Sequence, residues 1–399
     1  PDESHFDVKG PYEFDMNIAK PEPILDFWAS ELTFVIQSED YWNEVGDEGY
    51  GAHPVGTGAF RFVEHETNSH YLYEKVDDHW RQTAEMDELE FALVREPATR
   101  EAMLLTKEAQ MAIVSSTVDG VNRIRDRGFK VTHSTQPSNM VEFHIGGQFY
   151  QTIPGGGAEL DPNNPLTKLE VRKALNMAIN REEMNEVFYG GEMAFMPVTH
   201  IFPASDYGMK DRFVPYAYDP EGAKKLLAEA GFGNGFKLEV KYGASTTIPE
   251  IGDITETAAN YWKAIGIEID SVDATDNLWS QMKDFSLNQG VAMMTFGRVS
   301  HELQVILNFK IPESMDANFT SHTFDHPDMG KLISEFAVTI DKDERVRRME
   351  ELGDYFYDNH ITIPLFWYFT AFAYDPGVIE EYLGLRAATV KWEYATLVK

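Results

Sequence analysis

Cysteine is absent from all 399 residues of the sequence. Disulfide bonds, thiolate metal sites and cysteine nucleophiles are therefore excluded. The sequence also lacks a run of about 18 apolar residues, the length that a membrane-spanning helix needs. Residues 1–5 form neither the basic nor the apolar segment of an export signal. We therefore expect a chain that does not span a membrane, and any export signal has been removed or lies upstream of residue 1.

Basic residues are scarce, since 34 Lys and Arg face 66 Asp and Glu, which gives a formal net charge of -32. A field of this sign repels phosphate backbones and anionic lipid headgroups, so nucleic acid is not an expected partner. Two interpretations of the acidity stay open. It attracts cationic ligands, or it is a solvated surface that maintains solubility, which is the more common reason for such a balance.

Sequence motifs for common catalytic chemistries are missing as well. There is no Walker loop, no Gly-x-Ser-x-Gly elbow and no dinucleotide fingerprint. His65 and His70 flank a segment similar to the zinc motif His-Glu-x-x-His, but with one residue too many. On a helix this spacing would turn the two imidazoles about 140° apart. The sequence therefore predicts no metal, no cofactor and no paired nucleophile and base.

The hydrophobic share of 43% and the aromatic share of 13% indicate a folded protein, and the length suggests two domains. Alternating and apolar runs predict strands at residues 60–63, 71–75, 87–94, 111–114, 141–145, 236–242, 267–272, 291–296 and 361–372. Helical periodicity begins near residues 97, 168, 181, 220, 254 and 342. Strands that alternate with helices predict an α/β protein with mixed sheets flanked by helices.

Helix starts are marked by cap residues. Thr167 with Glu170 and Asn180 with Glu183 have the spacing of capping boxes. Asp219 precedes a proline, as an N-cap commonly does, and Asp341 stands before the last long helix.

Two phrases are more specific than any periodicity. Residues 53–62 read HPVGTGAFRF, a proline–glycine turn that leads into a strand, and residues 164–181 read NPLTKLEVRKALNMAINR. In this order they resemble signatures of the family 5 extracellular solute-binding proteins, the oligopeptide, dipeptide and nickel receptors of bacterial ABC importers. The resemblance runs from about residue 50 to the C-terminus. Further matching phrases lie at residues 71–75, 79–80, 89–94, 97–100, 218–232 and 363–368.

The resemblance implies a two-lobed periplasmic-binding-protein fold of type II, similar to large cluster C. Lobe I would comprise residues 1–143, without the N-terminal portion usual in the family, and lobe II residues 144–368. Residues 369–399 would return to lobe I. The chain would cross between the lobes near residues 143–147 and again near residues 366–369.

The function implied by the resemblance is that of a non-enzymatic receptor. It would capture a peptide-like or other organic solute between the lobes and deliver it to the permease subunits of an ABC transporter. We expect a monomer in the periplasm or outside the cell, with a lipid anchor through a missing N-terminus as a further expectation. A secreted hydrolase that acts on a peptide or glycoside in the same cleft is the alternative.

Six residues are candidates for the ligand site. Arg298 ends an apolar strand, where a forked contact to a carboxylate or phosphate is possible, and its alternative is an ion pair with Glu302. Peptide-binding members carry an acid after this strand; Glu302 is the nearby acid here, and Arg298 has the opposite sign. The remaining candidates are stacking or polar groups with structural alternatives, namely Phe296, Trp367, Tyr368 and His144.

Overall fold

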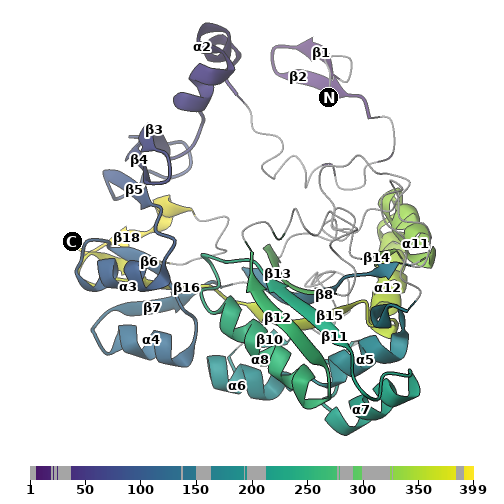
Figure 1. Cartoon of the computed structure of the whole chain (residues 1–399). Helices are drawn as coiled ribbons and strands as arrows, with labels where there is room; N and C mark the ends of the chain where they lie inside the picture. The colour runs from purple at the N-terminus through teal and green to yellow at the C-terminus, as the bar shows by residue number, and fades with distance from the viewer. Residues whose placement is uncertain are drawn as a thin grey trace.

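The structure is a computed structural model of the chain. It describes residues 6–18, 21, 25, 37–135, 138–149, 163–192, 194–195, 213–275, 278, 291–298, 324–325, 327–382 and 391–399. Figure 1 shows lobe II as a central sheet with helices below it and to one side, and lobe I as smaller sheets and helices beside it. The two-lobed α/β fold expected from the sequence is therefore present.

The strands, in chain order, are β1 (Phe6–Gly10), β2 (Glu13–Met16), β3 (Phe60–Glu66), β4 (His70–Lys75), β5 (Glu88–Ala92), β6 (Met111–Val114), β7 (Lys130–His133), β8 (Asn139–Ile145), β9 (Gln148–Phe149), β10 (Ala194–Phe195), β11 (Lys237–Tyr242), β12 (Glu268–Ala274), β13 (Val291–Arg298), β14 (Phe324–Asp325), β15 (Thr362–Tyr368), β16 (Ala371–Tyr374), β17 (Ile379–Glu381) and β18 (Thr396–Leu397). The helices are α2 (Glu39–Ala52), α3 (Pro97–Leu105), α4 (Val118–Arg125), α5 (Leu169–Met177), α6 (Arg181–Tyr189), α7 (Pro220–Glu229), α8 (Ile251–Ala264), α11 (Pro327–Ala337) and α12 (Lys342–Asp358), with short 3-10 turns η3 (Pro165–Thr167) and η7 (Trp392–Tyr394).

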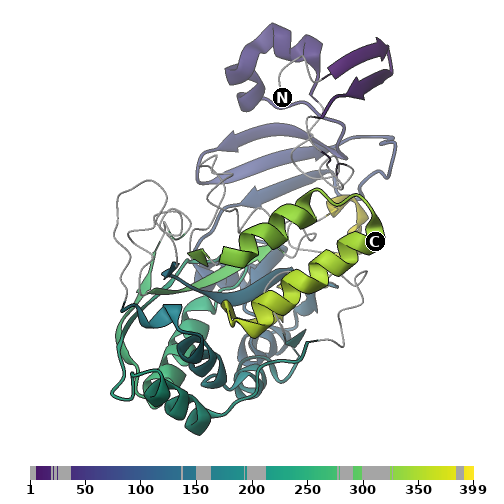
Figure 2. The same cartoon turned by 90° about the vertical axis from the view of Figure 1, so that its right-hand side faces the viewer.

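Lobe II is organised around a six-stranded sheet in the order β10-β15-β8-β13-β11-β12. Strands β11, β12 and β13 run parallel to one another, and β8 runs antiparallel to both of its neighbours, β13 and β15. Helices α5 to α8 supply the core on one face of this sheet. Helices α11 and α12 supply the core on the other face, and Figure 2 shows them side by side in front of it. The sheet is thus the middle of three layers.

The phrase at residues 164–181 folds into η3, α5 and the start of α6, and its polar residues fasten these helices to β15. Arg172 donates from Nε to the Asn359 carbonyl at 2.9 Å and from Nη1 to two carbonyls of η3. Asn176 Nδ2 donates to the Thr362 carbonyl at 3.0 Å, and Arg181 Nε donates to the Pro364 carbonyl at 2.7 Å. Most apolar residues of the phrase are buried in the lobe II core, namely Leu166, Val171, Ala174, Leu175, Ala178 and Ile179.

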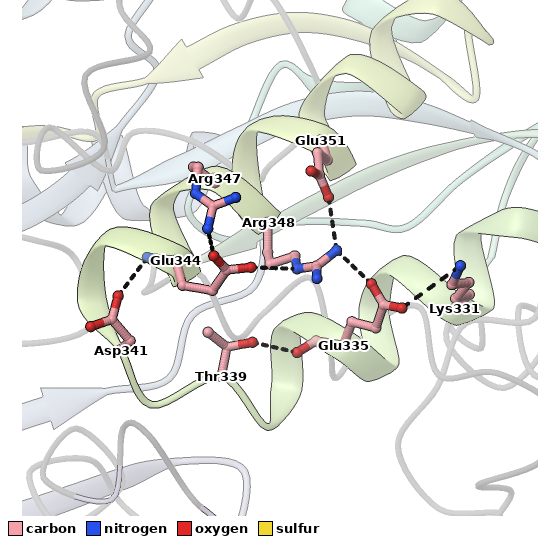
Figure 3. Close-up of polar contacts among 8 residues, drawn as sticks. All are labelled: Lys331, Glu335, Thr339, Asp341, Glu344, Arg347, Arg348 and Glu351. Carbon is pink, nitrogen blue, oxygen red and sulfur yellow. Dashed lines mark hydrogen bonds and ion pairs between the residues drawn. The ribbon is translucent and has the colours of Figure 1, made fainter.

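Helices α11 and α12 are joined by the ion-pair cluster drawn in Figure 3. Arg348 Nη1 lies 2.6 Å from Glu335 of α11, and Arg348 Nε lies 3.0 Å from Glu344 on its own helix. Glu351 also reaches Arg348 at 3.2 Å. Because these side chains are half-exposed, each pair contributes little by itself, and the apolar seam beneath them supplies most of the packing energy.

Lobe I contains two three-stranded sheets, β6-β16-β7 and β3-β4-β5, and the strand pair β17-β18. The turn at residues 53–59 leads into β3, and its carbonyls are held by side chains from elsewhere. Tyr41 donates to the His53 carbonyl at 3.0 Å, and Tyr50 donates to that of Val55. His79 Nε2 and Trp80 Nε1 lie 3.0 and 3.1 Å from the Thr57 carbonyl oxygen. The phrases at residues 53–62 and 79–80, which are separate in the sequence, are therefore in contact in the structure. The turn has a structural role, since it positions β3.

Within the described residues, the chain passes between the lobe sheets at two places. β7 belongs to the lobe I sheet and β8 to the lobe II sheet, so the first passage lies at residues 134–138. The sequence placed it near residues 143–147, but residues 139–144 are paired on both sides within lobe II, and the proposed boundary at 143/144 falls inside β8. The second passage, at residues 369–370, divides the run 361–372 into β15 and β16.

Hydroxyl groups bind these two passages together. Ser138 Oγ donates to the Tyr368 carbonyl at 3.0 Å and accepts from the Thr370 backbone N–H at 3.0 Å. Ser116 Oγ of lobe I donates to the Phe369 carbonyl at 3.0 Å. These hydrogen bonds hold the two passages side by side.

Of the four residues predicted to cap helix N-termini, three are confirmed. Asn180, Asp219 and Asp341 each accept a hydrogen bond from the backbone N–H three residues later, at 3.1, 2.8 and 2.9 Å. The prediction for Thr167 is wrong. Its hydroxyl donates back to the Asn164 carbonyl at 2.8 Å, because residues 165–167 form a 3-10 turn and α5 begins later, without a side-chain cap.

Candidate functional site

A pocket of about 950 Å³ lies where the two lobes face each other. One wall comes from lobe I, from the segment 93–97 between β5 and α3. The opposite wall comes from lobe II, from Tyr242 at the end of β11, the loop that follows it, and the first residues of α8. Thr275 and Leu278, which follow β12, close one side.

The position of the pocket follows from the topology of the sheet. β11 and β12 are parallel, and both end at the pocket, where the Thr275 N–H donates to the Tyr242 carbonyl at 2.8 Å. Loops at the carboxyl ends of parallel strands are where α/β folds place their ligands. The helix that follows β11 is α8, so its first turn also faces the pocket, with the partial positive charge of a helix N-terminus.

The loop between β11 and α8 is held in shape by one hydroxyl. Ser245 Oγ accepts from the N–H groups of Thr247 and Ile248 at 3.3 and 3.0 Å. The Ile248 side chain is fully buried in the lobe II core, which anchors the loop. The Ser245 and Thr246 positions remain as polar lining of the pocket.

Glycine at position 252 leaves room for the Tyr242 ring. A Cβ atom there would lie 3.0 Å from the Tyr242 hydroxyl oxygen and 3.2 Å from its ring. The Tyr242 ring thus packs directly on the first turn of α8. This contact fixes one corner of the pocket.

Charged groups of both signs line the pocket. Arg95 and Glu96 come from the lobe I wall, and Asp253 comes from the first turn of α8. The pocket can therefore offer acceptors to a cationic group and a donor to an anionic one.

Behind the lobe II wall lies a buried acid, Glu250. It accepts a hydrogen bond from the Tyr368 hydroxyl at 3.0 Å and another from Ser115 of lobe I at 3.1 Å. Burial raises the pKa of the Glu250 carboxyl, and burial together with the nearby Glu250 charge raises the pKa of Tyr368 well above its usual value. Tyr368 therefore acts as a hydrogen-bond donor at neutral pH.

Among the residues proposed from sequence, Arg298 and Tyr368 are brought together. Both pair with Asn139 of β8, Arg298 from β13 on one side and Tyr368 from β15 on the other. Asn139 Nδ2 lies 3.4 Å from the Thr247 hydroxyl oxygen, so this row of the sheet adjoins the loop that lines the pocket. Of Arg298, the structure describes the backbone only.

The aromatic candidates lie on two faces of the sheet. Tyr368 packs in the core beneath α5 to α8, whereas its neighbour Trp367 packs against α11 and α12. Both are buried, with 0% and 6% exposure. Phe296 is described by its backbone, which pairs with Val141. Because adjacent strand residues point to opposite faces, Trp367 and Tyr368 do not wall the same space, and their ligand contacts stay predictions.

His144 lies at the other end of β8, about 17 Å of strand from Asn139. It is buried, and its Nε2 lies 3.1 Å from the equally buried carboxylate of Glu142. A ligand role for His144 stays a prediction, and Glu302 lies outside the described residues. Within the described residues no group of His, Asp and Glu side chains could hold a metal ion. None of the described helices combines the length and apolar character needed to cross a bilayer.

Sequence reasoning did not identify the loop 243–249, Arg95, Glu96 or Asp253 as pocket residues. A signal was present, because the strand at residues 236–242 was predicted and the end of such a strand is a common ligand position. That rule was applied only to the strand that ends at Arg298.

The sequence profile described as bacterial extracellular solute-binding proteins, family 5, middle region, matches residues 1–300. This is about three quarters of the chain. The chain belongs to this family. The match includes the first 50 residues, which the sequence phrases did not cover, and it ends before the phrase at residues 363–368.

Curated relatives are similar over part of their length. The dipeptide-binding protein of Escherichia coli K12 is 26% identical over 227 residues, which are 56% of this chain and 39% of that protein. A glutathione-binding protein of Pectobacterium atrosepticum is 31% identical over 188 residues, 47% of this chain and 33% of that protein. The matches therefore span well under half the length of these relatives.

Solved structures of the same fold cover nearly the whole chain. A DppA protein of Helicobacter pylori in complex with the peptide STSA has a TM-score of 0.79 at 18% identity, covering 99% of this chain and 74% of that one. NikA of Staphylococcus aureus in complex with Ni(L-His)2 has a TM-score of 0.75 at 16% identity, covering 99% and 79%. These likenesses establish the type II periplasmic-binding fold.

Proposed function

We propose that this protein of the family 5 solute-binding group is a non-enzymatic receptor that captures a small solute between its lobes and delivers it to the permease of an ABC importer. The observation that carries the proposal is the pocket of about 950 Å³ whose walls come from both lobes. Its size is typical of a small-molecule site. Membership of a family of binding proteins supports a receptor in place of a hydrolase.

The solute that fits best is a peptide-like or other organic molecule with groups of both signs. Glu96 and Asp253 can accept from a cationic group, and Arg95 can donate to an anionic one. Relatives named for dipeptide and glutathione binding point to the same class. Such a receptor works as a monomer outside the cytoplasmic membrane, with a lipid anchor as one way to stay near its permease.

A thermal-shift screen with dipeptides, tripeptides, glutathione and haem tests this function. A solute at 100 times its Kd should stabilise the folded protein by about 2.7 kcal/mol. Asp253→Asn keeps the size of the side chain but removes its charge. This variant should bind a cationic solute less tightly and should leave the affinity for other solutes unchanged. No stabilisation by any member of the screen would argue against the receptor function, and turnover of a peptide or glycoside would favour the hydrolase.

Replacing Arg298 with alanine should weaken binding of an anionic solute by about tenfold or more, because a forked, charge-assisted contact is lost. Isothermal titration of the solute found in the screen measures the change. Arg347→Ala is the matched control, since Arg347 is an exposed cation on α12 that pairs with Glu344. Unchanged affinity in Arg298→Ala would remove Arg298 from the site.

A further inference from the structure

Arg100 of α3 spans the boundary between the lobes. Its guanidinium donates from Nε to the Ile113 carbonyl at 3.1 Å and from Nη1 to the carbonyls of Val94 and Arg95 at 2.9 and 2.8 Å. These three acceptors belong to lobe I. Its remaining nitrogen, Nη2, donates to the Thr246 carbonyl of lobe II at 3.2 Å.

Two of the four acceptors, the carbonyls of Arg95 and Thr246, belong to residues that line the pocket. Arg95 lines it from lobe I and Thr246 lines it from lobe II, while Arg100 itself is not part of the lining. The side chain is half-buried, and burial lowers the pKa of its guanidinium without making it neutral at physiological pH. Arg100 therefore ties the two walls together from behind, in the planar fork geometry that lysine cannot reproduce.

Three of the four hydrogen bonds of Arg100 lie within lobe I, and one crosses to lobe II. Rotation about the passages at residues 134–138 and 369–370 would leave the three lobe I bonds intact and break the bond to Thr246. A second contact also crosses between the lobes. Ser115 of lobe I donates to Glu250, which follows the same lobe II loop. Both contacts join lobe I to lobe II, so a separation of the lobes would break them.

We propose that Arg100 is a positioning residue that latches the closed state by holding the 243–249 loop of lobe II against lobe I. The proposal rests on the proposed receptor function, because closure then sets affinity. Arg100 acts on the solute through the pocket walls and does not touch it.

The latch sets the apparent affinity for the solute because it sets the fraction of molecules in the closed state. If the Thr246 contact favours the closed state by about tenfold, its loss lowers the closed fraction and raises the apparent Kd by up to the same factor. Tenfold corresponds to about 1.4 kcal/mol, which is in the range of one hydrogen bond to a charged group.

The lack of cysteine in the chain makes the distance between the lobes measurable. Glu108 in lobe I and Ala228 in lobe II are exposed positions, so both can be replaced by cysteine and spin-labelled. Pulsed electron paramagnetic resonance then gives the distance distribution between the two labels in the solute-free protein. Arg100→Gln and Arg100→Lys should each shift the distribution toward longer distances, and the Kd of the screened solute should rise by about five- to tenfold. Arg100→Lys keeps the charge and serves as the deciding variant if Arg100→Gln does not fold.

Arg123→Gln is the matched control. Arg123 donates to Glu101 from Nε at 2.7 Å and from Nη2 at 2.8 Å, entirely within lobe I. Its loss should lower thermal stability and leave the distance distribution unchanged. A wild-type distribution in both Arg100 variants, with only the stability lowered, would overturn the latch. The distance measurement needs no solute, so an empty solute screen refutes the receptor function while the latch is still decided.

Discussion

Replacing Arg181 with alanine is expected to lower the free energy of unfolding by about 3–5 kcal/mol, because buried acceptors lose their donor. Arg181 is 4% exposed, and burial lowers the pKa of its guanidinium to about 10. It donates to the Pro364 carbonyl at 2.7 Å, to the Asn176 carbonyl at 3.0 Å and to the Asn176 side-chain oxygen at 2.9 Å. Alanine leaves these oxygens unpaired inside lobe II and also opens a cavity under the Tyr216 ring, which the guanidinium faces at 5.8 Å.

Urea unfolding at neutral pH measures the change. Lys173→Ala is the control, since Lys173 is a cation on the exposed face of the adjacent helix α5 and its removal should stay within about 0.5 kcal/mol of wild type. A loss below about 1 kcal/mol in Arg181→Ala would show that water or a rearranged β15 satisfies the three oxygens.

The phrase at residues 164–181 shows how far the sequence could lead. Its helix, its buried face and its cap at Asn180 follow from local spacing and are confirmed. Arg172, Asn176 and Arg181 each donate to one backbone carbonyl at or near β15, nearly two hundred positions away, and a carbonyl has no residue type. Local pattern therefore predicts the helix but not what its arginines hold.

The same reason explains what was missed at the pocket. Arg100 was visible in the phrase at residues 97–100, yet all four of its acceptors are backbone oxygens. The loop 243–249 consists mainly of small and hydroxyl residues, and their pattern is that of any turn. Helix α4 was also not predicted, because its eight residues contain a glycine and few apolar positions. Arg298 could be proposed because it is a charged residue that directly follows an apolar run.

Acidification should destabilise the protein through His360. Burial, reinforced by the charges of Lys173, Arg172 and Arg181, lowers the pKa of His360 to about 3 from an ordinary 6.5. The ring packs against Tyr216 with centroids 4.3 Å apart and an interplanar angle of 31°, and its Nδ1 has no hydrogen-bond partner within the described part of the chain. The folded state therefore keeps His360 neutral over a range in which the unfolded chain binds a proton.

The sign follows directly from linkage. The contribution of neutral His360 to the free energy of unfolding is fully present above pH 6.5. It is lost as the pH falls toward 3, by about 1.4 kcal/mol per pH unit. Between neutral pH and about pH 4.5 the contribution of His360 amounts to roughly 2–3 kcal/mol. His360→Asn should remove this part of the loss, since asparagine tolerates the positive φ of 47° at this position.

Urea unfolding of wild type and His360→Asn near neutral pH and near about pH 4.5 gives the difference in slope. Carboxylates contribute to the pH dependence of both proteins, so the quantity that matters is the difference between them. His65→Asn, on the exposed strand β3, should follow the wild-type slope. Parallel slopes for wild type and His360→Asn would mean that His360 takes up a proton in the folded state, which requires an anionic or water partner at Nδ1.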